Sequence, residues 1–241
     1  LETVREFGME QLTAADELDD VRRSHAAYFL DFAEQRAQSP FIFTMPLAEL
    51  NRFAADHDNL GAACDQLLSV NAIDDCLRLG TACTPYWFTR GHLREGAARL
   101  KRGLAIDGSP SSAARAYALN AATNLAIFMG NYRDADAFSR EALAIWNVIG
   151  DARGRAATLF DLARIAEVDG NWDEAADLFD RAAAIFRDLG ETYHIGRALS
   201  LRGGVAYVQG DLDLAIRLEN EATTLFRQIG VLRWIGITEW F

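Results

Sequence analysis

Histidines, cysteines and neighbouring carboxylates are the side chains of this sequence that could do chemistry. Its four histidines, His25, His57, His92 and His194, are scattered along 241 residues. His57 followed by Asp58 suggests a general base with its partner. Adjacent residues on a helix, however, point about 100° apart and pair poorly. No Ser/His/Asp arrangement has support from its local context. The sequence therefore predicts no catalytic residue and a protein that is not an enzyme.

The thiols come from Cys64, Cys76 and Cys83. Cys76 and Cys83 lie on one expected helix, roughly 10 Å apart along its axis. That separation is too long for a disulfide. The sequence has no CxxC pair and no Cys/His cluster with the spacing of a zinc site. It therefore predicts buried structural thiols in a reducing compartment, and no metal site.

Charge and motifs exclude further functions. The formal net charge is −11, whereas a DNA-binding surface is normally basic, so we expect no direct nucleic-acid contact. Glu141, Asp173 and Glu174 are expected to be solvated. No GxxxxGK[ST] loop occurs and no GxGxxG follows a strand, so no cofactor is expected in these residues. No signal peptide and no run of about 18 apolar residues is present, which predicts a soluble cytoplasmic protein without membrane contact.

The elements that must position any site repeat with a period of 40 residues. Glycine stops recur halfway through and at the end of each period, at Gly130, Gly150, Gly170, Gly190, Gly210 and Gly230. Two stops per period, each after an apolar-periodic run, indicate two helices and two turns in tandem. Such a unit cannot bury its own apolar face and must stack on its neighbours. The sequence thus predicts an all-α fold, an α-solenoid of helical hairpins.

The expected helix pairs are 73–89 with 93–106, 112–129 with 132–149, 152–169 with 172–189, and 192–209 with 212–229. Before them we expect helix up to about residue 37 with a break near 13–16, an extended connector at 41–46, and one helix from 46 to about 69. These ranges predict an N-terminal helical region at 1–70 and a repeat array at 72–241. The array has about four repeats and a fifth that is cut near Trp234. Because the chain begins with Leu1 inside an expected helix, it is expected to be an excised fragment.

Small residues recur where paired helices must approach closely, at fixed offsets from the turn glycines. They are Gly96, Ala135, Ala175, Ala215, Gly103, Ala142, Ala182, Ala222, Thr84, Thr123, Ala163 and Gly203. Large apolar residues fill the positions between them, and small against large at fixed offsets is how helices interlock. Asn131, Asn171 and Asp211 stand where a side-chain oxygen could cap the second helix of each pair. The mid-repeat glycines should end that helix in a left-handed turn.

Over residues 72–235 these positions resemble the tetratricopeptide repeat, and residues 189–215 resemble its 40-residue variety. In that family the hairpins form a right-handed superhelix, and the first helix of each pair lines its concave surface. The resemblance implies a groove whose aromatic, amide and arginine side chains suit a protein segment or a small-molecule effector. The expected lining is Arg78, Phe88, Tyr117, Asn120, Asn124, Phe128, Phe160, Arg164, Glu167, Arg197, Ser200 and Tyr207. Packing between repeats is the alternative role for many of these residues, and self-association is a further expected use of the array.

Residues 1–105 carry a second resemblance, in four ordered segments. They read LETVREFGMEQL at 1–12, VRRSHAAYF at 21–29, DHDNLGAA at 56–63 and YWFTRGHLREG at 86–96. Together they resemble bacterial STAND (AP-ATPase) regulators, including LuxR-type relatives. In that family such a segment follows a nucleotide-binding domain and a winged helix. The resemblance implies ATP or ADP in an upstream domain, and a non-enzymatic sensor segment of a cytoplasmic transcriptional regulator here. The alternative is a free-standing scaffold that binds a linear peptide of a partner protein.

Overall fold

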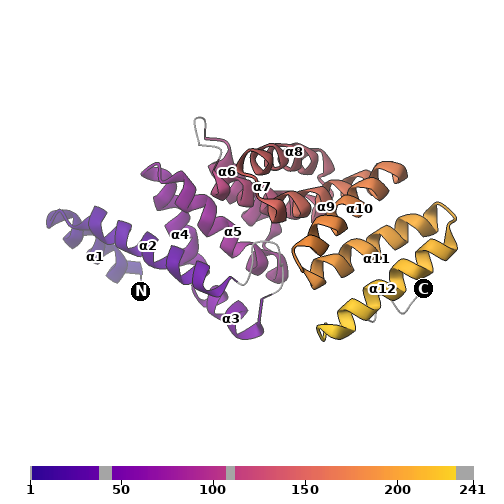
Figure 1. The fold of residues 1–241 in the computed structure, drawn as a ribbon. Helices are drawn as coiled ribbons and strands as arrows, with labels where there is room; N and C mark the ends of the chain where they lie inside the picture. Colours follow the sequence, from indigo (N-terminus) through magenta and orange to yellow (C-terminus); the bar gives the residue numbers. More distant parts are fainter. Residues whose placement is uncertain (1, 38–44, 107–111, 232–241) are drawn as a thin grey trace. The chain divides into compact units, whose positions relative to one another are not determined.

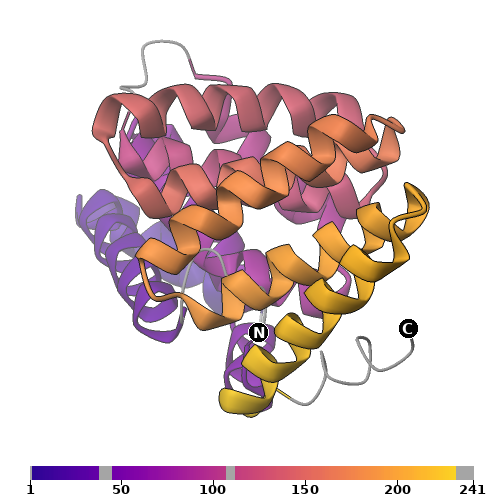
Figure 2. The same ribbon diagram turned by 45° about the vertical axis from the view of Figure 1, so that its right-hand side comes forward.

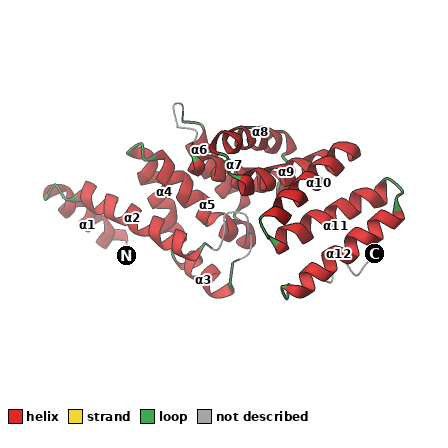
Figure 3. Cartoon of the chain, in the orientation of Figure 1, coloured by secondary structure: helices red, strands yellow, loops and turns green. Residues whose placement is uncertain are grey.

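The computed structural model describes residues 2–37, 45–106 and 112–231, and all regular elements in these ranges are helices (Figure 3). The predicted all-α class is therefore confirmed for the described residues. The chain forms two compact units, Leu1–Ala121 and Ala122–Phe241. The proposed division at residues 70–72 stays a prediction. Most of the expected connector at 41–46 and the expected fifth repeat near Trp234 lie outside the described residues.

The first unit contains six complete helices among its described residues (Figure 1). They are α1 (Glu2–Ala14), α2 (Leu18–Arg36), α3 (Leu47–Ala55), α4 (His57–Ser69), α5 (Ile73–Arg90) and α6 (Leu93–Leu104), followed by the start of α7 (Ala113–Phe128). Helix α5 packs against α2, α4 and α6. Its side chains are buried along most of its length, including Leu77 and Tyr86. The core of this unit therefore surrounds α5.

The expected continuous helix from residue 46 to 69 is wrong. The backbone leaves helical geometry at Asp56, with φ −107° and ψ 17°, and α4 begins at His57. The Asp56 carboxylate accepts a hydrogen bond of 2.9 Å from Asn59 Nδ2. Local hydrogen bonds of Asp and Asn side chains compete with helix propagation. The apolar period continues through this point, which is why the pattern alone does not reveal the break.

The second unit continues from the end of α7 through five further helices. They are α8 (Tyr132–Ile149), α9 (Ala152–Val168), α10 (Trp172–Asp188), α11 (Thr192–Val208) and α12 (Leu212–Gln228). Each successive pair from α8 to α12 packs side by side (Figure 2). All four predicted helix pairs of the repeat array are confirmed, with every end within two residues of its expected position. None of the described helices is long and apolar enough to cross a membrane.

The turns between helices depend on glycines in the left-handed region. Gly150 has φ +80°, and its N–H donates to the Trp146 carbonyl at 2.9 Å, which closes the end of α8. Gly190 and Gly230 also have positive φ, so the expected left-handed turns are confirmed.

The helix caps are confirmed only in part. Asp211 accepts a hydrogen bond from Leu214 N–H at 3.0 Å, as expected. The caps expected from Asn131 and Asn171 are wrong, because neither side chain bonds to the first turn of its helix backbone. The Asn131 amide instead donates to Asp134 at 2.9 Å.

The predicted small residues are all buried, as close helix packing requires. Gly154, in the first turn of α9, shows how closely α8 and α9 pack. A Cβ at Gly154 would lie 2.4 Å from Cδ2 of Trp146, the largest fully buried side chain. The tryptophan ring therefore occupies the space that a side chain at residue 154 would need.

Candidate functional site

In the second unit, α7 and α9 bring together Asn124, Asp161 and Arg164. Asn124 Nδ2 donates to Asp161 Oδ2 at 2.9 Å, and Arg164 Nη1 donates to Asn124 Oδ1 at 3.2 Å. The same Arg164 nitrogen lies 3.5 Å from Asp161 Oδ1. We call these three residues the α7–α9 cluster. Its closed set of contacts fixes the orientation of the Arg164 guanidinium.

Two arginines of this unit lie over aromatic rings. The Arg164 guanidinium carbon is 5.4 Å from the Phe128 ring centroid. The Arg197 guanidinium carbon, on α11, is 4.6 Å from the Phe160 centroid and 5.9 Å from the Tyr193 centroid. Such cation–π contacts restrain the planar guanidinium of each arginine.

Burial changes the charge of the acids around these arginines. It raises the pKa of Asp161 to about 6, although Arg164, Arg197 and the Asn124 hydrogen bond favour the ionised form. Burial also raises the pKa of Glu167 to about 7, opposed by Arg164. At neutral pH Asp161 is therefore mostly ionised and Glu167 only about half ionised.

The other predicted lining residues of the second unit differ in exposure. Phe160 and Ser200 are buried, whereas Phe128 and Tyr207 are 50% and 55% exposed. Ser200 Oγ points toward α12 and donates to Glu219 Oε1 at 3.2 Å. Phe160 and Ser200 therefore lie in the packing between helices and contribute little exposed surface.

Glu219 is a buried acid with an incomplete hydrogen-bond shell. Its Oε2 is buried and has no hydrogen-bond partner in the described part of the chain. Burial raises the pKa of Glu219 to about 7, and the Ser200 hydrogen bond only partly offsets this. The carboxyl group therefore stays neutral at pH values well above the usual pKa of glutamate.

Glu219→Gln is expected to stabilise the chain more at pH 8 than at pH 5. The folded-state pKa is raised, so Glu219 ionises near pH 4.5 when unfolded and near pH 7 when folded. Stability from this group is full below about pH 4.5 and falls as the pH rises to about 7. Glutamine cannot ionise, so the gain at pH 8 should exceed that at pH 5 by on the order of 2 kcal/mol. Urea unfolding at both pH values measures this.

The matched control for that prediction is Glu221→Gln on the same helix. The Glu221 side chain is 49% exposed and pairs with Arg187. Its removal should shift the urea midpoint by a similar, small amount at both pH values. Equal gains from Glu219→Gln at pH 5 and pH 8 would contradict the buried-acid interpretation.

In the first unit, Arg78 and Tyr117 line one cavity of about 300 Å³. Arg78 donates through Nε and Nη2 to both oxygens of Glu34, at 2.8 and 2.6 Å, and through Nη1 to Asp75 at 2.9 Å. The rest of the lining is mainly small or apolar: Ala37, Thr81, Ala82, Pro85 and Ala114, together with Glu34. Of the other predicted residues in this unit, Asn120 is buried and Phe88 is half-buried.

Sequence reasoning did not find Asp161, Tyr193 or Glu34. Asp161 lies three residues before Arg164, and an acid at this spacing from an arginine on a helix is a recognisable pairing signal. Glu34 pairs with Arg78 across 44 residues, and no local pattern indicates such a contact. The expected solvation of Asp173 and Glu174 is confirmed, and the three cysteines are buried free thiols as predicted.

Comparison with known families decides the nature of the repeats. A family described as "Tetratricopeptide repeat" matches residues 155–228, which contain α10, α11, α12 and most of α9. This segment is a tetratricopeptide-repeat region. The predicted resemblance is thereby confirmed for that range. No curated protein matches the chain by sequence.

Solved structures agree with the repeat fold. The chain is similar to BtubC (BKLC) from P. vanneervenii, with 14% identity and a TM-score of 0.58 over 88% of this chain and 92% of that one. It is similar to MamA, with 16% identity and a TM-score of 0.57 over 85% and 93%. Aspartyl phosphate phosphatase F from Bacillus subtilis gives 14% identity and a TM-score of 0.67 over 93% of this chain and 58% of that one. At these identities the likeness shows the fold alone.

Proposed function

We propose that this chain is a non-enzymatic binding module whose tetratricopeptide repeats hold a protein segment. The observation that carries the proposal is the pair of restrained arginines, Arg164 and Arg197, on the first helices of successive repeats. The tetratricopeptide fold itself indicates binding of proteins or peptides. The groove face that we propose is formed by the end of α7, by α9 and by α11, all within the second unit.

The chemistry of this face favours a peptide that carries a carboxylate beside an apolar side chain. A guanidinium has five N–H donors in a rigid fork that matches a carboxylate. The contact with Asn124 already orients Arg164, so less side-chain entropy is lost when a ligand binds. The half-exposed Phe128 ring offers apolar surface next to this arginine.

Within this function, the finer proposal is a sensor segment of a cytoplasmic STAND-type transcriptional regulator. Its support is the ordered set of N-terminal segments at 1–12, 21–29, 56–63 and 86–96. A bound protein segment or small-molecule effector would act on an upstream ATP- or ADP-binding core. It can shift that core only if it binds one conformation better than the other. A full-length gene without an upstream P-loop would exclude this proposal.

The second candidate is a free-standing adaptor that binds a linear peptide. It is favoured by the coverage of the solved structures. This chain spans 92% of BtubC and 93% of MamA, so a helical array of this extent accounts for nearly all of each solved chain. The upstream gene sequence distinguishes the adaptor from the regulator segment.

A screen of linear peptides against the immobilised full chain tests the shared part of both proposals. We expect an enriched motif with an acidic residue next to a hydrophobic one. A chain carrying Arg164→Ala and Arg197→Ala should lose this enrichment. A small-molecule sensor would give no motif, and that result would contradict peptide binding.

A further inference from the structure

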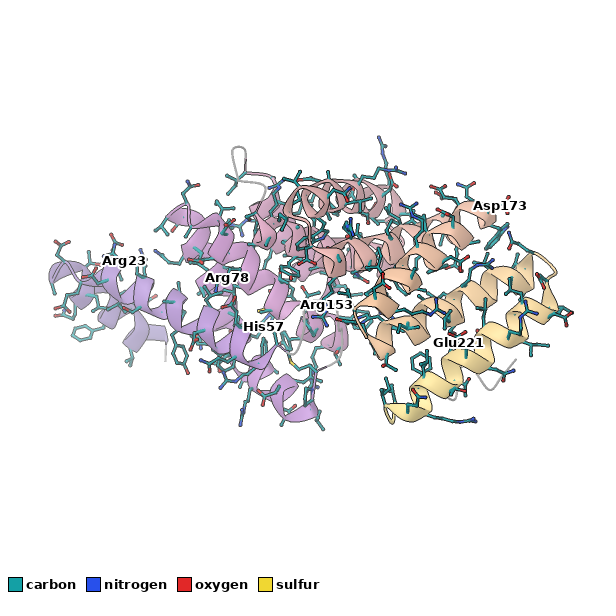
Figure 4. All side chains as sticks on the ribbon, viewed as in Figure 1. Arg23, His57, Arg78, Arg153, Asp173 and Glu221 are labelled. Carbon is teal, nitrogen blue, oxygen red and sulfur yellow. The ribbon has the colours of Figure 1, made fainter. Side chains whose placement is uncertain are left out.

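Two histidines and a glutamate from different helices meet in the first unit. His57 is the first residue of α4, His92 directly precedes α6, and Glu95 lies in the first turn of α6. His57 Nε2 is 3.2 Å from Glu95 Oε2, and His92 Nδ1 is 3.9 Å from the same oxygen. The two imidazole rings stack with centroids 4.7 Å apart and an interplanar angle of 28°. Figure 4 labels His57 among the side chains of this unit.

We propose that His57, His92 and Glu95 bind one divalent transition-metal ion such as Zn²⁺. One ligand atom from each residue lies within 4.8 Å of the others. Tetrahedral zinc with bonds of about 2.0–2.1 Å places its ligand atoms about 3.3 Å apart. The His57–Glu95 pair has this separation already. The partly exposed His92 side chain must move inward by about 1 Å to complete the site.

The donor set selects the class of ion. Two imidazole nitrogens and one carboxylate are a known zinc combination that leaves a fourth position open to water or a further ligand. Imidazole suits zinc, copper, nickel and iron, whereas calcium and magnesium require oxygen ligands. The three side chains are 27%, 39% and 32% exposed, so an ion can reach them from solvent. The site therefore fits a transition metal better than a hard cation.

Neighbouring residues hold two of the three ligands in position. Tyr86 Oη lies 3.1 Å from His57 Nδ1, a contact that directs Nε2 of the same ring toward Glu95. Arg99 Nε donates to Glu95 Oε1 at 3.0 Å, and this leaves Oε2 to face the imidazoles. Outer partners of this kind orient ligands and raise metal affinity.

Two features of the surroundings oppose a cation. Arg99 carries a positive charge, and both α4 and α6 direct the positive end of their dipole toward the site. The Glu95 carboxylate offsets one positive charge. Dipole effects at partly exposed helix ends are also small compared with metal–ligand bonds. The Arg99 charge and the helix dipoles should therefore lower the affinity for the metal ion without abolishing binding.

Titration of the metal-free, tag-free full chain with Zn²⁺ by calorimetry tests the proposal. We expect one zinc ion per chain. His57→Gln, His92→Gln and Glu95→Gln should each weaken binding by at least about 100-fold, since each removes a ligand. Tyr86→Phe keeps every ligand and should weaken binding by about 10-fold. His25→Gln, on α2 of the same unit, is the matched control and should bind zinc like the original chain.

Cobalt spectroscopy reports on the ligands themselves, so it tests the site even if a variant is less stable than the original chain. Co²⁺ added to the original chain should give visible bands of a tetrahedral site without a sulfur charge-transfer band. His92→Cys should retain binding and add that band in the near ultraviolet. Absence of stoichiometric zinc binding by the original chain would overturn the proposal. Zinc binding by His57→Gln or His92→Gln that is as tight as that of the original chain would overturn it as well, as would a sulfur charge-transfer band in the original chain.

Discussion

Replacing Trp146 with alanine is expected to lower the free energy of unfolding of the second unit by about 3–5 kcal/mol, the usual cost of deleting a large buried aromatic side chain. Trp146 is completely buried, and its ring lies in the notch that Gly154 leaves in α9. The cavity would open at the joint between α8 and α9, two helices that pack directly on each other. Urea unfolding followed by circular dichroism measures the loss as a lower midpoint.

Val148→Ala is the control for this prediction, because Val148 lies on the same helix and is 84% exposed. It should change stability by less than about 0.5 kcal/mol. Gly154→Ala tests the fit from the other side and should cost about 1–3 kcal/mol through overpacking. In the double variant the two losses should be less than additive, since alanine at residue 146 frees the space for the new methyl group. If Trp146→Ala and Val148→Ala lowered the free energy of unfolding equally, the proposed packing of Trp146 against Gly154 would be refuted.

Arg164→Ala is expected to weaken binding of a selected acidic peptide by about 10–100-fold, the range for a lost charge-assisted hydrogen bond in a partly buried site. The Arg164 side chain is only 16% exposed, so solvent screens its contacts weakly. Fluorescence anisotropy with a labelled peptide measures the dissociation constant. Arg164→Lys should recover only part of the affinity, because an ammonium group cannot form the two-pronged contact.

A matched variant separates local recognition from general attraction of an acidic peptide. Arg181 lies on α10, is 57% exposed, and pairs with Asp177. Arg181→Ala removes the same charge from the same unit but leaves the groove face intact. We expect less than a threefold change, about 0.6 kcal/mol. If both alanine variants weaken binding equally, Arg164 contributes only long-range electrostatics. Arg164→Ala also removes a partner of the buried Asp161 and should lower the stability of the chain. The binding of the two alanine variants should therefore be compared at a temperature well below the melting temperature of either one.

The helical hairpins could be predicted closely because their signals are local. A glycine with positive φ ends a helix within one turn, and the apolar period of 3.6 residues is visible in each segment. The break at Asp56 was missed for the opposite reason, since the apolar period runs through it without interruption. At that boundary the Asp56 carboxylate accepts a hydrogen bond from Asn59 Nδ2, a contact between side chains that the apolar period does not indicate.

The candidate sites could be predicted only in part. Asn124 and Arg164, both expected as lining residues, stand one repeat period apart and are in contact, although no such pairing is predicted from the sequence. Helical phase does not distinguish an exposed lining residue such as Phe128 from a buried one such as Phe160. His57 and Glu95 lie on two different helices and are 38 residues apart in the chain, and no sequence pattern specifies their contact.

Photo-crosslinking of a selected peptide tests the binding proposal most directly. The peptide would carry a benzophenone side chain next to its acidic residue, and mass spectrometry would locate the adducts on the full chain. We predict adducts on α7, α9 and α11, concentrated near Phe128, Arg164 and Arg197. Adducts confined to α8, α10 and α12 would contradict a binding face on the first helices of the repeats.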